Sequence, residues 1–161
     1  EVKEAQKLSG EDRLAMIINM VQQLADKMEN DPKNVEGWIR LGRSYEVLNK
    51  HAKSRDAYSK AAALKPKNLL ILTAYAVAIA RAQKPDAAVP QESKNVSEQI
   101  LALNPSHGTA LWFSGIAMME AGNRLGARDR WLQLLATLEP KGAKHSKVLE
   151  KIKSLGLPIK P

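Results

Sequence analysis

Three histidines and a few pairs of acidic residues are the side chains of this chain that could do chemistry. His51, His107 and His145 have no second histidine or carboxylate at a metal-ligand spacing such as H-E-x-x-H, so they are interpreted as surface histidines. Pairs such as Glu11 and Asp12 fall at helix ends, where acids complement the helix dipole. The chain has no cysteine and no glycine-rich phosphate loop. These residues predict no catalytic site, no metal site and no cofactor, so function is expected in a binding surface.

The residues that do recur at meaningful spacing are apolar, aromatic or small. Trp38, Leu41 and Tyr45 lie at helical spacing and would fill the seam of a helix pair, and Gly42 would let the second helix approach closely. The spacing matches the 34-residue tetratricopeptide (TPR) signature W-x2-L-G-x2-Y…A-x3-F…P. The matching positions are Trp38, Leu41, Gly42, Tyr45, Tyr58, Ala61 and Pro66.

A period of 34 residues carries this pattern forward. Trp38 maps to Leu72 and Tyr45 to Ile79, and the second copy closes five residues late, which places an insertion at residues 84–91 where Pro85 and Pro90 favour a loop. A third copy follows Pro105. Its expected core positions are Leu111, Ser114, Gly115, Met118, Ala127 and Trp131.

Two amphipathic segments flank the repeats and are expected to cap the ends of the stack. Ser9 with Asp12 predicts a capping box before the first one. The fold class is therefore all-α, a TPR helical solenoid of three helix-pair repeats between two capping helices. Helices are predicted near 11–30, 35–48, 51–64, 69–83, 92–103, 107–121, 125–138 and 143–155. The expected domain organisation is a flexible lead-in at 1–10, a TPR domain at 11–155 with repeats at 35–66, 69–105 and 107–140, and a tail at 156–161.

Charge is distributed unevenly along the chain. The net charge is +8, yet residues 1–31 hold seven acids and four bases, whereas residues 141–161 hold six lysines against one glutamate. Two interpretations stay open for these lysines: the solvated face of the capping helix, or a patch that binds phosphate or lipid headgroups. Nucleic-acid binding is a minor hypothesis, because aromatic residues make up only 4% of the chain.

In a right-handed stack the first helix of each pair lines the concave wall. The residues expected there are Ile39, Arg43, Glu46, Thr73, Val77, Ala80, Trp112, Ile116 and Met119. This mostly apolar groove suits an amphipathic helix or an extended apolar peptide. It lacks the lysine and asparagine by which some TPR domains hold acidic C-terminal tails, since Ile39, Thr73 and Val77 stand on the wall. Trp112 has an alternative position, packed under a neighbouring helix or the 84–91 loop.

Several segments sharpen the resemblance beyond the repeat. Together they resemble the periplasmic TPR domain of the c-type cytochrome biogenesis factors that work with haem lyase. The segments are the helix end Asn30-Asp31-Pro32, the run from Val35 to Tyr45, the insertion in the second repeat, the stretch from Ala110 to Gly115 and Arg130-Trp131. Ser54, where the pattern prefers alanine, and the basic tail are departures from it.

The resemblance implies a chaperone-like module that captures the C-terminal helix of an apocytochrome c in its groove and presents it to the haem lyase complex. It also implies a periplasmic location and tethering by a membrane-anchored N-terminal part. A close relative serves cytochrome c nitrite reductase. The chain starts at Glu1 and has no apolar run near the roughly 20 residues that span a bilayer, so we expect a processed or excised fragment. The alternatives are a generic TPR adaptor for another protein and a binder of anionic polymer or lipid through the C-terminal helix.

Overall fold

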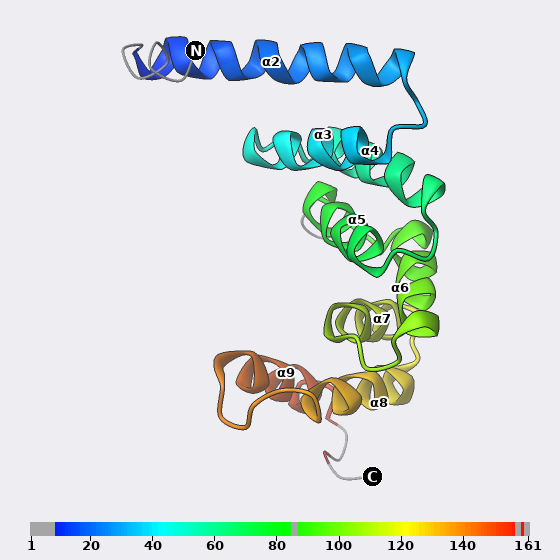
Figure 1. The fold of residues 1–161 in the computed structure, drawn as a ribbon. Helices are drawn as coiled ribbons and strands as arrows, with labels where there is room; N and C mark the ends of the chain where they lie inside the picture. The colour runs from blue at the N-terminus through cyan, green and yellow to red at the C-terminus, as the bar shows by residue number, and fades with distance from the viewer. Residues whose placement is uncertain (1–8, 85–86, 157–158, 160–161) are drawn as a thin grey trace. The chain divides into compact units, whose positions relative to one another are not determined.

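The computed structural model describes residues 9–84, 87–156 and 159, and every regular element in these residues is an α-helix. The chain divides into two compact units, Glu1–Pro66 and Lys67–Pro161. The helices are labelled in Figure 1 and coloured from blue to red along the chain. They are α2 (Gly10–Asn30), α3 (Val35–Val47), α4 (His51–Leu64), α5 (Leu69–Ala82), α6 (Gln91–Leu103), α7 (Gly108–Glu120), α8 (Arg124–Leu135) and α9 (Ala143–Lys153). The predicted TPR helical solenoid is confirmed as the fold class.

The first unit contains α2 and the pair α3 and α4. The Ser9 hydroxyl accepts a hydrogen bond from the Asp12 amide at 3.2 Å, as the predicted capping box requires. The apolar stripe of α2 is buried only from Val21 onward, where Met28 reaches Gly37 of α3, and Leu14 is 51% exposed. This helix therefore covers the end of the repeat with its second half alone.

The helix pair of the first repeat packs as its sequence motif predicts. A Cβ at residue 42 would lie 2.9 Å from the Tyr58 ring, so only glycine permits this approach of α3 and α4. The Trp38 side chain is buried, and its indole N–H donates to the Pro32 carbonyl at 2.9 Å. Asn49 joins the two helices at φ 54°, in the left-handed region where asparagine is among the better-tolerated residues.

The second unit contains two further helix pairs, α5 with α6 and α7 with α8, followed by α9. Consecutive helices pack on one another, and α5 also packs against α7. Its core is fully covered and is formed by Leu72, Ile79, Ile100, Leu111, Trp131, Ile152 and Leu155. Between α6 and α5, Pro85 and Asp86 of the predicted insertion lie outside the described residues. The Val89 amide donates to Glu120 at 2.6 Å, which ties this connection to the end of α7.

Five helices end earlier than predicted, three of them by one residue and two by more. The helix predicted to reach residue 138 stops at Leu135, and the one predicted to reach 155 stops at Lys153. After α8 the backbone tightens into bonds of the i to i−3 type, since the Thr137 amide donates to Leu134 and the Leu138 amide to Leu135. Pro140 then biases Glu139 away from the helical region. The apolar pattern continues through this turn, which explains why the pattern overestimates the helix.

Candidate peptide-binding site

The nine predicted groove residues fall into two groups, one in each unit. Ile39, Arg43 and Glu46 lie on α3 of the first unit. Ile39 is half-buried and Arg43 is exposed. The Glu46 side chain is only 15% exposed, and its carboxylate lies 3.9 Å from His51 Nδ1 at the start of α4. Within this unit Glu46 is therefore engaged by its own repeat, which leaves Ile39 and Arg43 as the more accessible members.

The first unit also has a pocket that sequence reasoning missed. Its volume is about 300 Å³, and it lies among α2, α3 and α4. The Lys60 ammonium lies 4.1 Å from the centre of the Trp38 ring, and the Lys53 ammonium lies 5.6 Å from that of Tyr45. Two carboxylates, Glu29 and Asp56, line the same pocket. The lysines here thus share their surroundings with acidic groups.

Tyr45 borders this pocket and has a perturbed phenol. Burial raises the pKa of Tyr45 above its ordinary value of 10.0, and the carboxylate of Asp26 adds to the effect. Both causes disfavour the phenolate, because burial removes its hydration and Asp26 repels its charge. The phenol is consequently held in its neutral form to a higher pH than in a solvated chain.

Six predicted groove residues belong to the second unit, and all six side chains are half-buried. They are Thr73, Val77 and Ala80 on α5, and Trp112, Ile116 and Met119 on α7. The Thr73 hydroxyl donates to the Leu69 carbonyl at 2.7 Å and lies 3.1 Å from Nε2 of His107. His107 precedes α7 as its N-cap residue and is half-buried, as His51 and His145 are. It links the first helices of two successive repeats.

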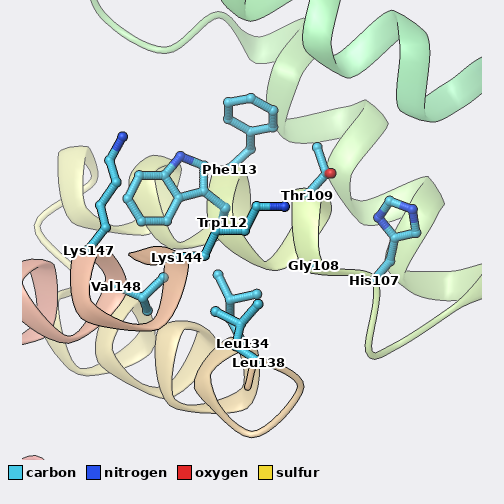
Figure 2. Close-up of a pocket in the computed structure, with 10 residues that line it drawn as sticks. All are labelled: His107, Gly108, Thr109, Trp112, Phe113, Leu134, Leu138, Lys144, Lys147 and Val148. Atoms are coloured by element: carbon cyan, nitrogen blue, oxygen red, sulfur yellow. The ribbon is translucent and has the colours of Figure 1, made fainter. Parts of the chain in front are cut away.

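Trp112 packs toward the C-terminal end of the second unit. Its ring lies 5.9 Å from that of Trp131 on α8, and its carbonyl accepts a hydrogen bond from the Trp131 indole at 3.3 Å. The alternative in which Trp112 packs against a neighbouring helix is therefore correct in part. The rest of its ring lines a pocket of about 440 Å³. The pocket is lined by His107, Gly108, Thr109, Trp112, Phe113, Leu134, Leu138, Lys144, Lys147 and Val148 (Figure 2).

This pocket joins two features that the sequence analysis kept apart. Lys147 extends from α9 beside Trp112, with its ammonium 5.9 Å from the centre of the Trp112 ring, and Lys144 extends from the same helix toward Thr109 (Figure 2). The lysine-rich helix and the apolar wall therefore meet at these two lysines. The signal that could have found them is the period itself. Thirty-four residues after α7 comes α9, which occupies the place of a first helix in the next repeat.

The parts of the chain that the structure describes contain neither a metal-ligating cluster nor a membrane-spanning helix. Within those parts, no three histidine or acidic side chains gather where they could hold an ion. None of the helices described is both long enough and apolar enough to cross a bilayer.

The fold and the pocket define a TPR domain that presents half-buried apolar side chains next to lysines. Residues 4–145 match the family described as the cytochrome c-type biogenesis protein H TPR domain. The chain belongs to this family. The resemblance drawn from the sequence is thereby confirmed.

Relatives with curated names agree with this assignment. The chain is 47% identical over 53 residues to the cytochrome c-type biogenesis protein CycH of Rhizobium meliloti (strain 1021), a match that covers 33% of this chain and 14% of that protein. It is 37% identical over 60 residues to CcmH of Escherichia coli (strain K12), covering 37% of this chain and 17% of that protein. The matched segments are thus a small part of each relative's length.

Solved structures show the same fold. The first TPR of Spaghetti (RPAP3), bound to the HSP90 peptide SRMEEVD, has a TM-score of 0.59 at 23% identity and covers 74% of this chain and 90% of its own. MamA has a TM-score of 0.56 at 16% identity and covers 86% of each chain. At these identities the likeness concerns the fold alone.

Proposed function

We propose that this domain is a non-catalytic chaperone module of cytochrome c maturation, which captures the C-terminal helix of an apocytochrome c for delivery to the haem lyase complex. The observation that carries the proposal is the apolar stripe of Trp112, Ile116 and Met119 on α7. These side chains stay half-buried in a chain that belongs to a cytochrome c biogenesis family. We place the domain in the periplasm, tethered through a segment outside this chain.

The stripe suits a helix as its ligand. Trp112, Ile116 and Met119 follow an i, i+4, i+7 spacing, so they form one face of α7, and Val77 and Ala80 of the adjacent α5 are half-buried as well. An amphipathic helix that lays its apolar face into such a groove exchanges water for side-chain contacts. The six predicted residues of the second unit remain our proposed binding surface, with the α7 stripe as its centre, and Ile39, Arg43 and Glu46 remain a separate proposed surface of the first unit.

The proposal also names the state of the ligand. Before haem attachment the C-terminal segment of a cytochrome c is unfolded and can expose its apolar face, whereas in the holoprotein that face is buried. Ordering the peptide on binding consumes about 2–5 kcal/mol of the contact energy, so an affinity in the micromolar range is expected. Burial of apolar area should give a negative heat-capacity change.

Calorimetry with three ligands tests the proposal: a synthetic peptide of the C-terminal helix, the intact apocytochrome and the holocytochrome. We expect binding of the peptide and the apoprotein and weak or no binding of the holoprotein. Trp112→Ala and Val77→Asp should each weaken binding of the peptide by about tenfold or more, while the helical circular dichroism signal of the domain is kept. Leu70→Ala is the matched control, because Leu70 is an apolar residue of α5 that is 82% exposed.

Equal affinity for apo and holo forms would refute the chaperone mechanism. Absence of peptide binding would leave a TPR adaptor for another protein. Affinity that falls steeply with salt and is insensitive to Trp112→Ala would indicate an anionic ligand instead.

A further inference from the structure

The pocket between α7 and α9 combines an apolar floor with a positive rim. Trp112, Phe113, Leu134, Leu138 and Val148 supply the apolar side chains, and Lys144 and Lys147 supply the charge. In Figure 2 Lys147 extends from α9 beside the Trp112 ring and Lys144 extends toward Thr109, with Leu134 and Leu138 on the opposite side of Lys144 from Thr109. The pocket can therefore hold an apolar side chain and an anionic group of a ligand next to each other.

The charge in this pocket is not balanced by the groups that line it. None of its lining residues is acidic, whereas the comparable pocket of the first unit, where Lys53 and Lys60 lie over aromatic rings, contains Glu29 and Asp56. Within the described residues no carboxylate is ion-paired with Lys144 or Lys147. The first turn of α9 has no acidic residue and no side-chain cap, so the positive end of the helix dipole adds to the lysines.

We infer that this pocket binds the C-terminal residue of the peptide ligand, with its apolar side chain on the Trp112 floor and its α-carboxylate between Lys144 and Lys147. The inference rests on the proposed function and specifies which part of the captured segment is read. It assigns α9 a role in recognition in addition to its role as a cap.

Geometry favours the terminal carboxylate over an acidic side chain. The Lys147 ammonium lies 5.9 Å from the centre of the Trp112 ring, so the apolar and anionic groups of the ligand must lie within the breadth of one residue. In a C-terminal residue the Cβ and the carboxylate carbon are only about 2.5 Å apart. Ammonium groups bind a charged carboxylate more tightly than a neutral amide, because charge-assisted hydrogen bonds are about twice as strong as neutral ones.

Fluorescence anisotropy with labelled peptides of about 20 residues, long enough for five helical turns, provides the test. The peptides carry the sequence of an apocytochrome C-terminal helix and end in leucine, as the free acid or as the C-terminal amide. We expect the free acid to bind about 5–10-fold more tightly than the amide. The double variant Lys144→Gln/Lys147→Gln should bind the two peptides equally, whereas Lys53→Gln/Lys60→Gln should keep the preference.

The second double variant is a matched control, because it also removes two lysine charges from a pocket lined by aromatic side chains. All four substituted lysines are exposed. Circular dichroism checks that each variant is folded. A chemical-shift change at the Trp112 indole on adding the free acid, and not the amide, is the expected second readout in the unmodified domain.

Several results would overturn the inference. Equal binding of acid and amide by the unmodified domain would refute it and leave the proposed apocytochrome binding intact. A preference that survives Lys144→Gln/Lys147→Gln, or is lost in the control variant, would place the carboxylate elsewhere. An amide peptide with glutamate near its end that binds as tightly as the free acid would assign the pocket to a side-chain carboxylate. Failure of both peptides to bind would refute the proposed function itself.

Discussion

Gly115 leaves no room for a side chain between α7 and α8, and Gly115→Ala should destabilise the domain. A Cβ at this position would lie 2.2 Å from the Trp131 indole nitrogen, about 1.3 Å short of the ~3.5 Å at which such atoms pack without strain. Trp131 cannot easily yield, because it is fully buried, contacts the Trp112 ring at a tilted angle and donates to the Trp112 carbonyl. The added methyl group therefore has to separate α7 and α8.

The magnitude follows from two opposed terms. Overpacking of this kind costs about 1–3 kcal/mol, and the rigidity of Trp131 favours the upper end. Alanine in place of glycine inside a helix stabilises the helix by about 1 kcal/mol. The net loss is then about 2 kcal/mol, which lowers the Tm of a domain of this length by about 4–8 °C.

Thermal unfolding followed by circular dichroism measures this shift. Gly10→Ala is the control, since Gly10 also lies in a helix but no atom lies within 4 Å of its Cβ position. The control should keep or slightly raise the Tm. A Gly115→Ala protein as stable as the control would refute the close crossing of α7 and α8.

Three further predictions concern the first unit. Trp38→Ala should cost about 3–5 kcal/mol of stability, against almost nothing for the 78% exposed Val47→Ala, and equal urea midpoints would mean that the repeat register is wrong. Ser54→Ala should raise stability by about 1 kcal/mol, because the buried Ser54 hydroxyl has no hydrogen-bond partner among the described residues; a loss would indicate that the hydroxyl is satisfied. Since the folded pKa of Tyr45 is raised, its contribution to stability is complete below about pH 10 and is lost as the pH rises through the folded value. In urea titrations over that alkaline range, the free energy of unfolding of the Tyr45→Phe variant should fall less than that of the unmodified domain. Identical dependence of the two free energies on pH would contradict the burial of the phenol.

The fold was predictable because the repeat requires particular residue types where its helices contact each other. Trp38, Gly42 and Tyr58 have packing roles that few other residue types fill, so their spacing alone predicts the helix pair, and the structure places Gly42 against the Tyr58 ring. Helix ends were less predictable. Leu138 continues the apolar pattern of α8 beyond the end of the helix, and the turn that stops the helix depends on backbone bonds that leave no mark in the pattern.

The site was predictable only along each helix. The spacing of Trp112, Ile116 and Met119 places them on one face of α7, but it does not say what stands opposite. Lys144 and Lys147 lie about one repeat later in the chain, and only the packing of α9 brings them to Trp112. Likewise, the contact of His107 with Thr73 joins residues 34 positions apart.

Helix α9 closes the core of the second unit and also supplies the charge of the pocket. Val148, Ile152 and Leu155 of this segment are buried, whereas Lys144 and Lys147, in the first turns of the helix, remain exposed at the pocket. Deleting the segment would expose that core and remove the pocket together, so loss of binding after truncation would carry no information about recognition. Substituting the lysines leaves the buried residues in place and changes only the charge. The two roles can be separated because Ile152 and Leu155, the fully buried residues of this segment, lie further along the chain than Lys144 and Lys147 at the pocket.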